Sequence, residues 1–191
     1  LAYNLPFALK KRSDEISEEA VLEQVSAVKK NMLSKGRHIE VFGVGSVKDA
    51  VRKIETFRPD LIFNLCEAFR GDPKKEMNVA ALWELLGIPY TGCEARTLAL
   101  SQNKVMAKKI MLSSGIPTPE YETAKSCPAR TSLSFPIIVK PAFEDGSVGI
   151  DSSSVVNDLS ALKKAVRRVL KKYGTPALLE KYIEGKEFHV S

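Results

Sequence analysis

The sequence predicts an α/β protein whose first part carries a parallel β-sheet. Up to residue 91, short apolar runs typical of strands alternate with longer stretches that have the periodicity of amphipathic helices. From Thr97 onward this alternation is lost, and a long helical stretch, a linker and a glycine-rich loop follow. Strands that alternate with helices favour a parallel sheet covered on both faces, with functional loops at the carboxyl ends of the strands. We therefore predict a domain boundary near residues 94–97.

The first domain is expected to follow the order β-α-β-α-β-α-β. Its first helix carries Ile16 and Val25 at helical spacing, and Gly36 offers a place for the helix to stop. Pro59 ends the second helix, because the residue before a proline is biased away from helical backbone. The expected helices are 13–31, 47–57 and 77–86. The expected strands are 39–42, 60–65, 89–91 and 1–4, the last as the tail of a strand that begins before this chain.

The second domain is expected to open with one helix over 95–114, because glycine and prolines follow it directly. A linker over 124–134 then leads to a strand over 135–140. After the glycine-rich loop we expect a strand over 150–156, an amphipathic basic helix that ends at Gly174, and a strand over 177–183.

The stretch 135–149 joins a buried strand to the glycine-rich loop. The strand has no polar face and ends at Lys140 and Pro141, and the loop over 142–149 contains two glycines and Ser147. Backbone N–H groups and a hydroxyl in such a loop can donate to phosphate oxygens, and Lys140 would add a positive charge. The alternative is a turn that joins two strands of a hairpin, with Lys140 marking only the strand's exit into water.

Composition indicates an ordinary globular protein. Hydrophobic residues make up 44% and charged residues 27% of the 191 residues, and no apolar run approaches the ~20 residues that a membrane span needs. The amino end lacks the charged-then-apolar order of a signal peptide. We therefore expect a cytoplasmic protein without a membrane partner.

Cysteine and histidine usage argues against several classes of site. Cys66, Cys93 and Cys127 lie far apart and form no CxxC pair, so neither a disulfide framework nor a zinc site is expected. Cys66 follows an apolar run and is interpreted as a core residue. The two histidines, His38 and His189, lack the partners of a metal site or a catalytic triad.

The positive charge is concentrated in one helix. The chain has a formal net charge of +6, and six lysines and arginines between residues 163 and 172 account for all of it. These residues recur in pairs every four positions between apolar residues, as on the solvated face of an amphipathic helix. No nucleic-acid partner is therefore expected, although an anionic partner such as RNA for this helix is a weaker alternative.

Several short motifs occur in a fixed order along the chain. Leu-Leu-Gly-Ile-Pro-Tyr-Thr-Gly over 85–92 precedes a lysine-bearing helix and the Gly-Ile-Pro that begins at Gly115. Val-Lys-Pro over 139–141 and the Gly-Ser-Val-Gly loop come next, followed by Glu-Lys-Tyr-Ile-Glu-Gly-Lys-Glu over 180–187. In this order, over nearly the whole chain, the motifs resemble the ATP-grasp superfamily, and within it the D-alanine–D-alanine ligases and their relatives.

The resemblance implies a fold and a division of the chain. Residues 1–95 would form a Rossmann-like, parallel-sheet domain, the pre-ATP-grasp domain that takes part in substrate binding. Residues 96–191 would form an α+β lid subdomain and the incomplete start of the C-terminal subdomain. ATP would lie between these two subdomains.

The resemblance also implies roles for single residues. Lys104 and Lys140 match the two lysines that contact the phosphates of ATP, and Ser147 matches a serine of the mobile phosphate loop. Glu187 matches the acidic residue that binds the ribose hydroxyls. These roles suit the chemistry, because a polyphosphate needs fixed cations and a carboxylate can accept both hydroxyls. The residues expected to bind ATP, including the adenine hinge that begins at Glu180, are Lys104, Lys140, Gly146, Ser147, Val148, Glu180, Lys181, Tyr182, Ile183 and Glu187.

The sequence departs from the ligase pattern in three places. The loop has Asp145 and Gly146 where the ligases usually carry glycine and serine. Residues 14–19 replace the N-terminal Gly-Gly-x-Ser-x-Glu signature, and Glu18 is the nearest counterpart of the acid that holds the first D-alanine. Residues 71–76 replace a Gly-Glu-Asp-Gly segment. These last two changes fall where the amino-acid substrate would sit, so the identity of the substrate stays open.

These inferences combine into an expected activity. The parent protein would be an ATP-dependent carboxylate–amine ligase that forms an acyl phosphate on an amino-acid-like substrate and works as a homodimer. Its catalytic residues would be Lys140, Ser147 and Glu18. The Mg²⁺ ligands are expected beyond residue 191, so that this chain would be a fragment without activity of its own and without a metal site. The alternative is a nucleotide-binding module of ATP-grasp fold that has lost ligase turnover.

Overall fold

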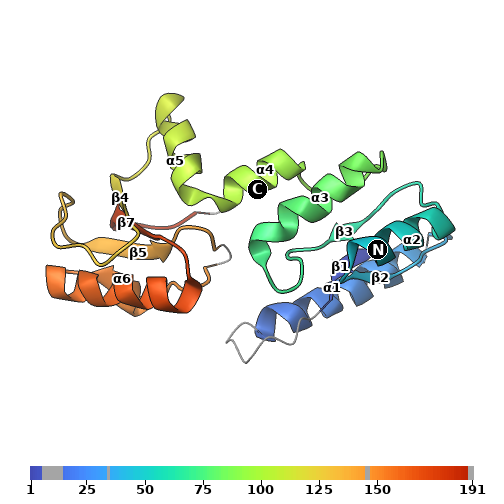
Figure 1. Cartoon of the computed structure of the whole chain (residues 1–191), viewed down its shortest axis with the longest axis horizontal. Helices are drawn as coiled ribbons and strands as arrows, with labels where there is room; N and C mark the ends of the chain where they lie inside the picture. Colours follow the sequence, from blue (N-terminus) through green and yellow to red (C-terminus); the bar gives the residue numbers. More distant parts are fainter. Residues whose placement is uncertain (6–14, 34, 145–146, 189–191) are drawn as a thin grey trace. The chain divides into compact units, whose positions relative to one another are not determined.

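The computed structural model describes residues 1–5, 15–33, 35–144 and 147–188. The chain separates into two compact units, Leu1–Ala99 and Leu100–Ser191, which are described one after the other (Figure 1). The predicted fold class, a parallel-sheet α/β part followed by an α+β part, is confirmed. In the described ranges, no helix combines the length and the apolar character that crossing a membrane would require.

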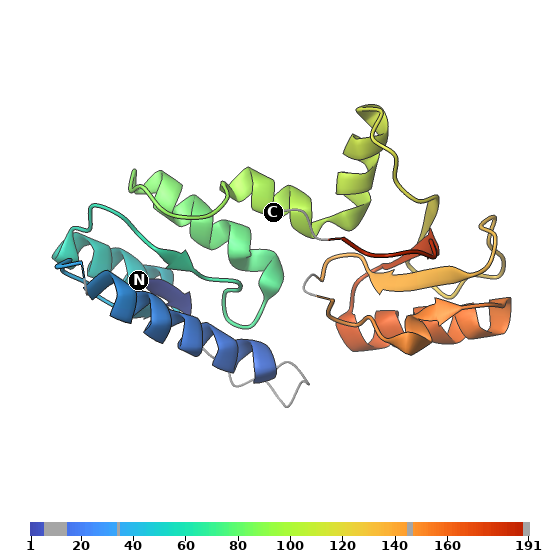
Figure 2. The same cartoon turned by 180° about the vertical axis from the view of Figure 1, so that it is seen from behind.

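The first unit is built on a parallel sheet. The strand order is β2-β1-β3, with β1 at Ala2–Asn4, β2 at Phe42–Val44 and β3 at Asn64–Leu65. The helices are α1 (Glu15–Leu33), α2 (Val47–Phe57), α3 (Glu76–Leu85) and the short 3-10 helix η1 (Pro73–Lys75). Figures 1 and 2 show α1 on one side of the sheet and α3 on the other, as a doubly covered parallel sheet requires.

The core of the first unit lies between the sheet and the helices α2 and α3. Trp83 of α3 is fully buried with Val44, Ile54 and Ile62 around it. Its indole N–H donates to Oδ1 of Asn64 at 3.2 Å, so the one polar atom of the ring is satisfied inside the core. The prediction that Cys66 is a core residue is confirmed, because it is buried in this same cluster.

Some boundaries in the first unit differ from the predicted ones. The helix α2 begins and ends as predicted, since Ser46 caps its start and Arg58 closes it in the left-handed conformation before Pro59. The predicted strand 39–42 was too early, because β2 takes its register from β1, where Ala2 pairs with Phe42. The predicted strand 60–65 is confirmed only at β3, and the strand expected at 89–91 is a single parallel bridge between Tyr90 and Ile62.

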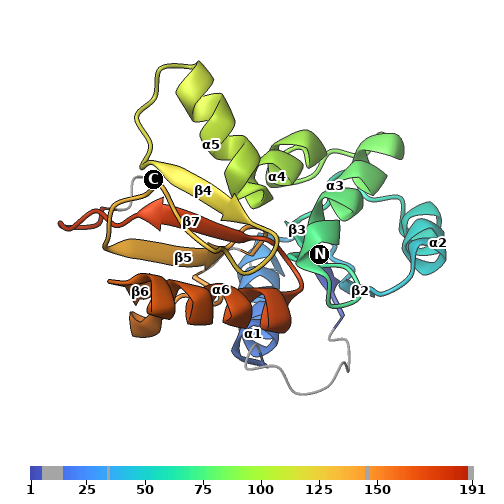
Figure 3. The ribbon, with the colours of Figure 1, turned by 60° about the vertical axis from the view of Figure 1, so that its left-hand side comes forward.

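The second unit is an antiparallel sheet with a helix over one face. The strand order is β4-β7-β5-β6, with β4 at Tyr121–Ala124, β5 at Ile137–Pro141, β6 at Val155–Val156 and β7 at Ala177–Lys181 (Figure 3). The basic helix is α6 (Leu159–Tyr173), capped by Asp158 and closed by Gly174 at φ 60°, as predicted. Apolar side chains of α6 pack on the sheet, namely Leu162, Val166 and Val169 against Ile137, Val139 and Leu179.

Two predicted strands of the second unit were too long, and one strand was missed. Residues expected to open the strand 150–156 form the 3-10 helix η2 (Ser152–Ser154), because the side chain of Asp151 accepts from the backbone N–H of Ser153 at 2.8 Å. The final strand ends at Lys181 rather than at residue 183. The missed strand is β4, whose mixed sequence carries no clear alternation and which exists because it pairs with β7.

The expected helix over 95–114 was wrong as a single helix. It is divided into α4 (Ala95–Gln102) and α5 (Lys104–Ser113). Asn103 between them leaves the helical conformation, and its side-chain oxygen accepts from the N–H of Met106 at 3.1 Å. Asparagine favours such a cap over a helix interior, so the break has a local cause.

We expect Asn103→Ala to destabilise the protein by about 1 kcal/mol, the usual cost of losing a side-chain cap. Urea unfolding followed by circular dichroism measures the change. Lys109→Ala, an exposed change on the same helix, is the control and should stay within about 0.5 kcal/mol of the parent protein. An equal loss in both variants would contradict the role of Asn103 as a cap.

Candidate functional site

A carboxylate and two lysines form the most buried charged cluster among the described residues. Glu180 lies on β7, where it pairs in register with Ile138 of β5 and Tyr121 of β4. Its neighbour Leu179 packs into the core under α6, so Glu180 points to the opposite face of the sheet. One carboxylate oxygen, Oε1, lies 2.6 Å from Nζ of Lys108, and the other, Oε2, lies 2.6 Å from Nζ of Lys140.

The cluster carries more positive than negative charge. Burial raises the pKa of the Glu180 carboxyl, but the hydrogen bonds and charges of Lys108 and Lys140 outweigh burial, so its pKa lies below the usual value. Glu180 is therefore ionised near neutral pH, and two ammonium groups surround one carboxylate. The Lys108 side chain is 5% exposed and the Lys140 side chain 26% exposed. Lys140 is thus the cation of the cluster that an anion in solution can approach.

The role of Lys108 was missed at the sequence level. It sits on α5 and also donates to Oγ1 of Thr118 at 2.6 Å, and its Nζ lies 5.0 Å from the centre of the Tyr121 ring. The one available signal is its position four residues after Lys104, which places both lysines on the same face of the helix. The burial of Lys108 could not be predicted from the sequence, because the residues that cover it come from distant segments.

Lys104 lies at the same end of β5 as Lys140. It is the first residue of α5, and its backbone N–H donates to the carbonyl of Ala142 at 3.2 Å. Its Nζ donates to the carbonyl of Pro141 at 3.3 Å. The structure therefore brings together Lys104 and Lys140, the two lysines predicted to meet phosphates, where the strand passes into the glycine-rich loop.

The glycine-rich loop is anchored at both of its ends. At the start, the N–H of Ala142 donates to the carbonyl of Pro176 at 3.0 Å. At the end, Gly149 has φ +77°, and a Cβ atom there would lie 2.8 Å from the side chains of both Pro141 and Tyr173. Between the anchors, Ser147 is exposed with φ 62° and Val148 is half-buried. Asp145 and Gly146 lie outside the described residues. The loop connects β5 to β6, which pair antiparallel. It therefore joins two paired strands, as the hairpin alternative predicts.

Gly149→Ala is expected to destabilise the protein by more than Gly174→Ala does. Both glycines have positive φ, which costs an alanine about 1–2 kcal/mol. Of these two glycines, only Gly149 has neighbours within 3.0 Å of where an alanine Cβ atom would lie, which adds about 1–3 kcal/mol of overpacking. Urea unfolding of the two variants measures the difference, and equal losses would show that the loop base tolerates a side chain.

The predicted adenine hinge and ribose residue lie at and beyond the end of β7. The N–H groups of Lys181 and Tyr182 donate to the carbonyls of Glu120 and Pro136, at 3.0 Å and 2.9 Å. Ile183 is 62% exposed, and Glu187 is exposed in the segment that follows. The structure thus brings Lys104, Lys140 and Glu180 together, and it leaves Ser147, Ile183 and Glu187 on exposed segments.

The predicted substrate residue belongs to the first unit. Glu18 lies in α1, and its side chain is outside the described part of the structure. At the carboxyl ends of the parallel strands, Oδ1 of Asn4 accepts from the N–H of Glu67 at 3.0 Å. Nε of Arg70 donates to the carbonyl of Gly45 at 3.0 Å. These contacts tie the polar loop after β3 to the edge of the sheet where functional loops are expected.

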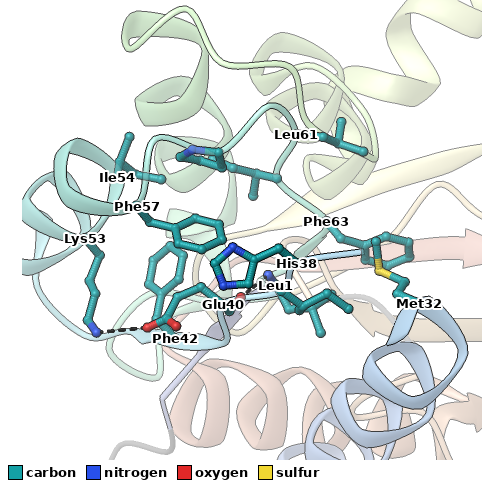
Figure 4. Close-up of a pocket in the computed structure, with 13 residues that line it drawn as sticks. Leu1, Met32, His38, Glu40, Phe42, Lys53, Ile54, Phe57, Leu61 and Phe63 are labelled. Carbon is teal, nitrogen blue, oxygen red and sulfur yellow. Dashed lines mark hydrogen bonds and ion pairs between the residues drawn. The ribbon is translucent and has the colours of Figure 1, made fainter. Parts of the chain in front are cut away.

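A pocket in the first unit lies at the other edge of this sheet. Its lining includes Leu1, His38, Phe42, Phe57 and Phe63, and Figure 4 shows the ring of His38 beside that of Phe57. The ion pair between Lys53 and Glu40, at 3.1 Å, lies at its rim. Because Leu1 and Glu40 precede β1 and β2, the pocket lies at the amino ends of the strands, away from the expected substrate loops.

Comparisons with known proteins bear on the family of this chain. The family described as D-ala D-ala ligase C-terminus matches residues 110–191. An uncharacterized protein of Sinorhizobium fredii is 37% identical over 132 residues, which cover 69% of this chain and 38% of that protein. The D-alanine–D-alanine ligase of Xylella fastidiosa is 33% identical over 162 residues, covering 81% of this chain and 52% of the ligase. The chain thus spans about half the length of the curated ligases that it matches.

Solved structures give the same result for the fold. The D-alanine–D-alanine ligase of Bacillus anthracis complexed with ATP superposes with a TM-score of 0.68 at 22% identity, covering 96% of this chain and 56% of that one. The ligase of Helicobacter pylori gives a TM-score of 0.54 at 27% identity, over 65% of this chain and 39% of that one. The family predicted from the order of the motifs is therefore confirmed: the chain belongs to the ATP-grasp superfamily as a relative of the D-alanine–D-alanine ligases.

Proposed function

We propose that the protein containing this chain is an ATP-dependent ligase that joins a carboxylate to an amine. The observation that carries the proposal is the convergence of Lys104 and Lys140 on the end of β5, next to the buried Glu180. Because the cluster around Glu180 holds two cations and one anion, it attracts a polyphosphate. The likeness to ligases named for D-alanine, one of them complexed with ATP, supports ATP as that polyphosphate.

The proposed reaction has two steps. An oxygen of the substrate carboxylate attacks the γ-phosphorus of ATP, the bond to the β,γ-bridging oxygen breaks, and ADP leaves with the electron pair. The nitrogen of an amine then attacks the carbonyl carbon of the acyl phosphate, a proton leaves the nitrogen, and phosphate departs. Lys104, Lys140 and the donors of the loop around Ser147 would stabilise the transferring phosphoryl group by fixed positive charge and hydrogen bonds.

The adenosine part of ATP is assigned to the segment after the cluster. We assign the adenine to the hinge Glu180, Lys181, Tyr182 and Ile183, and the ribose hydroxyls to Glu187. Gly146, Ser147 and Val148 would cover the phosphates. The described residues contain no group of three histidine, cysteine, aspartate or glutamate side chains that could hold a metal ion. From the family resemblance we propose that the ligands of the Mg²⁺ that accompanies ATP lie beyond residue 191, and we assign no step to the ion.

The carboxylate substrate is proposed to be amino-acid-like. D-alanine is the first compound to test, because several relatives are named D-alanine–D-alanine ligase. Glu18 is the proposed partner of its ammonium group. From the family resemblance we further propose a cytoplasmic homodimer in which residues 1–95 and 96–191 act as the substrate and nucleotide parts. Because the Mg²⁺ ligands are proposed to lie outside this chain, we also propose that the chain alone is inactive.

Release of ADP from ATP tests the proposed activity. The full-length protein is given ATP, Mg²⁺ and D-alanine, and then a panel of other amino acids and hydroxy acids. We expect ADP and phosphate in equal amounts, and only when the acceptor is present. If no acceptor produces ADP, the ligase proposal fails. If ADP is released only with acceptors other than D-alanine, the proposal for D-alanine fails and the reaction class stands.

A nucleotide-binding module without turnover is the second candidate. The observation that favours it is the replacement of the substrate signatures at residues 14–19 and 71–76, while the lysines of the nucleotide part are kept. Calorimetric titration of the full-length protein with ATP separates the two functions. Tight binding with no ADP release for any acceptor would support the module.

A further inference from the structure

We propose that Lys108 is a positioning residue of the nucleotide site. Lys108 stays paired with Glu180, so that Lys140 is able to leave Glu180 and pair with a phosphate of the nucleotide. This inference rests on the proposed binding of ATP to the second unit. It assigns to Lys108 a role that differs from that of Lys104 and Lys140, the two lysines at the end of β5.

The geometry separates the two oxygens of Glu180. Oε1 is held by Lys108 on α5 and Oε2 by Lys140 on β5, each at 2.6 Å. Lys108 is buried and donates in addition to Thr118 at 2.6 Å. A side chain enclosed in this way does not reach a ligand in solution, so it acts through Glu180. Lys140 has a side chain that is 26% exposed, and it is the partner that an incoming anion reaches.

The charge balance explains why two lysines are needed. When a phosphate draws Lys140 away from Oε2, a buried carboxylate with no other cation would be left without compensation, which is unfavourable. Lys108 stays in place during that exchange, so Glu180 remains paired and ionised. Without Lys108, Glu180 would have to take up a proton when the nucleotide binds, or Lys140 would remain on Glu180 and bind the phosphate poorly.

Among the described residues, two cations form ion pairs with Glu180, namely Lys108 from α5 and Lys140 from β5. Tyr121 lies opposite Glu180 on β4. The basic side chains of α6 belong to the helix that packs on the opposite face, against Leu179 and Val139. Lys104 precedes Lys108 by one turn, and its Nζ bonds to the carbonyl of Pro141.

The dissociation constant of ATP, measured from pH 8 to pH 6, tests the proposal in the full-length protein. For Lys108→Met we expect weaker binding than in the parent at pH 8. We also expect the ratio of the variant's dissociation constant to that of the parent to be at least threefold lower at pH 6 than at pH 8. The reason is that in the variant protonation of Glu180 releases Lys140. The limit for one coupled proton is tenfold per pH unit. Taking the ratio cancels the titration of ATP itself.

Three further variants separate this role from simple structural damage. Lys108→Gln keeps a hydrogen-bond donor without the charge and should show the same pH trend. It replaces Lys108→Met in the experiment if that variant does not fold. Lys108→Met combined with Glu180→Gln removes the carboxylate and should show no pH trend. Lys109→Met changes the exposed neighbour and should match the parent at every pH. A ratio that is constant or rises toward pH 6 overturns the role of Lys108, whereas failure of the parent protein to bind ATP overturns the proposed function instead.

Discussion

Replacing Glu180 with alanine is expected to destabilise the protein by about 3–5 kcal/mol, the range for breaking a buried ion pair by removing one partner. The loss comes mainly from Lys108, a buried lysine that would lose the carboxylate of its ion pair. Urea unfolding followed by circular dichroism measures it. The matched control is Lys108→Met combined with Glu180→Leu, which removes both charges and should recover most of the stability. A loss below about 1 kcal/mol in Glu180→Ala would contradict the buried pair.

The same carboxylate predicts how stability depends on pH. Because the pKa of Glu180 is lowered in the folded protein, its contribution is fully present above the usual carboxyl value of 4.5. It is lost as the pH falls through the lowered folded value. The stability advantage of the parent protein over Glu180→Gln should therefore be constant between about pH 8 and pH 5 and should shrink in more acidic solution. An advantage that grows toward acid would contradict this assignment.

Lys140→Ala is expected to weaken ATP binding by about 10- to 100-fold, which corresponds to the loss of one charge-assisted hydrogen bond of about 1.5–3 kcal/mol. The reason is that Lys140 is the accessible cation of the cluster, with a side chain that is 26% exposed. Calorimetric titration of the full-length protein with ATP measures the change. Because Lys108 still holds Glu180, the variant should fold, and its unfolding curve checks this.

The control for Lys140→Ala is Lys125→Ala, which removes an equal charge from an exposed position directly after β4. It should leave the affinity for ATP within about twofold, since an exposed lysine outside the cluster contributes little. If Lys140→Ala binds ATP as tightly as Lys125→Ala does, the strand and loop after residue 135 form only a hairpin connection.

Local chemistry explains which features were predictable. Pro59, Gly174 and the apolar face of α6 act through their nearest neighbours in sequence, and the elements that they define appear as expected. Lys104 and Lys140 were predicted to contact phosphates because the order of the motifs around them is specific. Their meeting at the end of β5 then follows from the fold of the second unit.

The missed features depend on distant partners or on one competing side chain. The strand β4 has no pattern of its own and is defined by its register with β7, in which Tyr121 lies opposite Glu180. Lys108 has the appearance of a solvated helix residue, and only the fold brings Thr118, Tyr121 and Glu180 around it. Asn103 divided a helix whose periodicity is otherwise continuous, because its side chain competes for a backbone N–H group.

The position of β7 has a consequence for how the second unit forms. β7 is the last strand of the sheet in sequence, yet it lies between β4 and β5 and joins them. In the described part of the sheet, β4 pairs with no other strand, so β4 is joined to the sheet only through residues 177–181. The same five residues include Glu180. The pairing of β7 with β4 and β5 joins segments that are far apart in sequence, which favours slow folding. The strand that joins β4 to β5 thus also carries the counter-ion of Lys108 and Lys140.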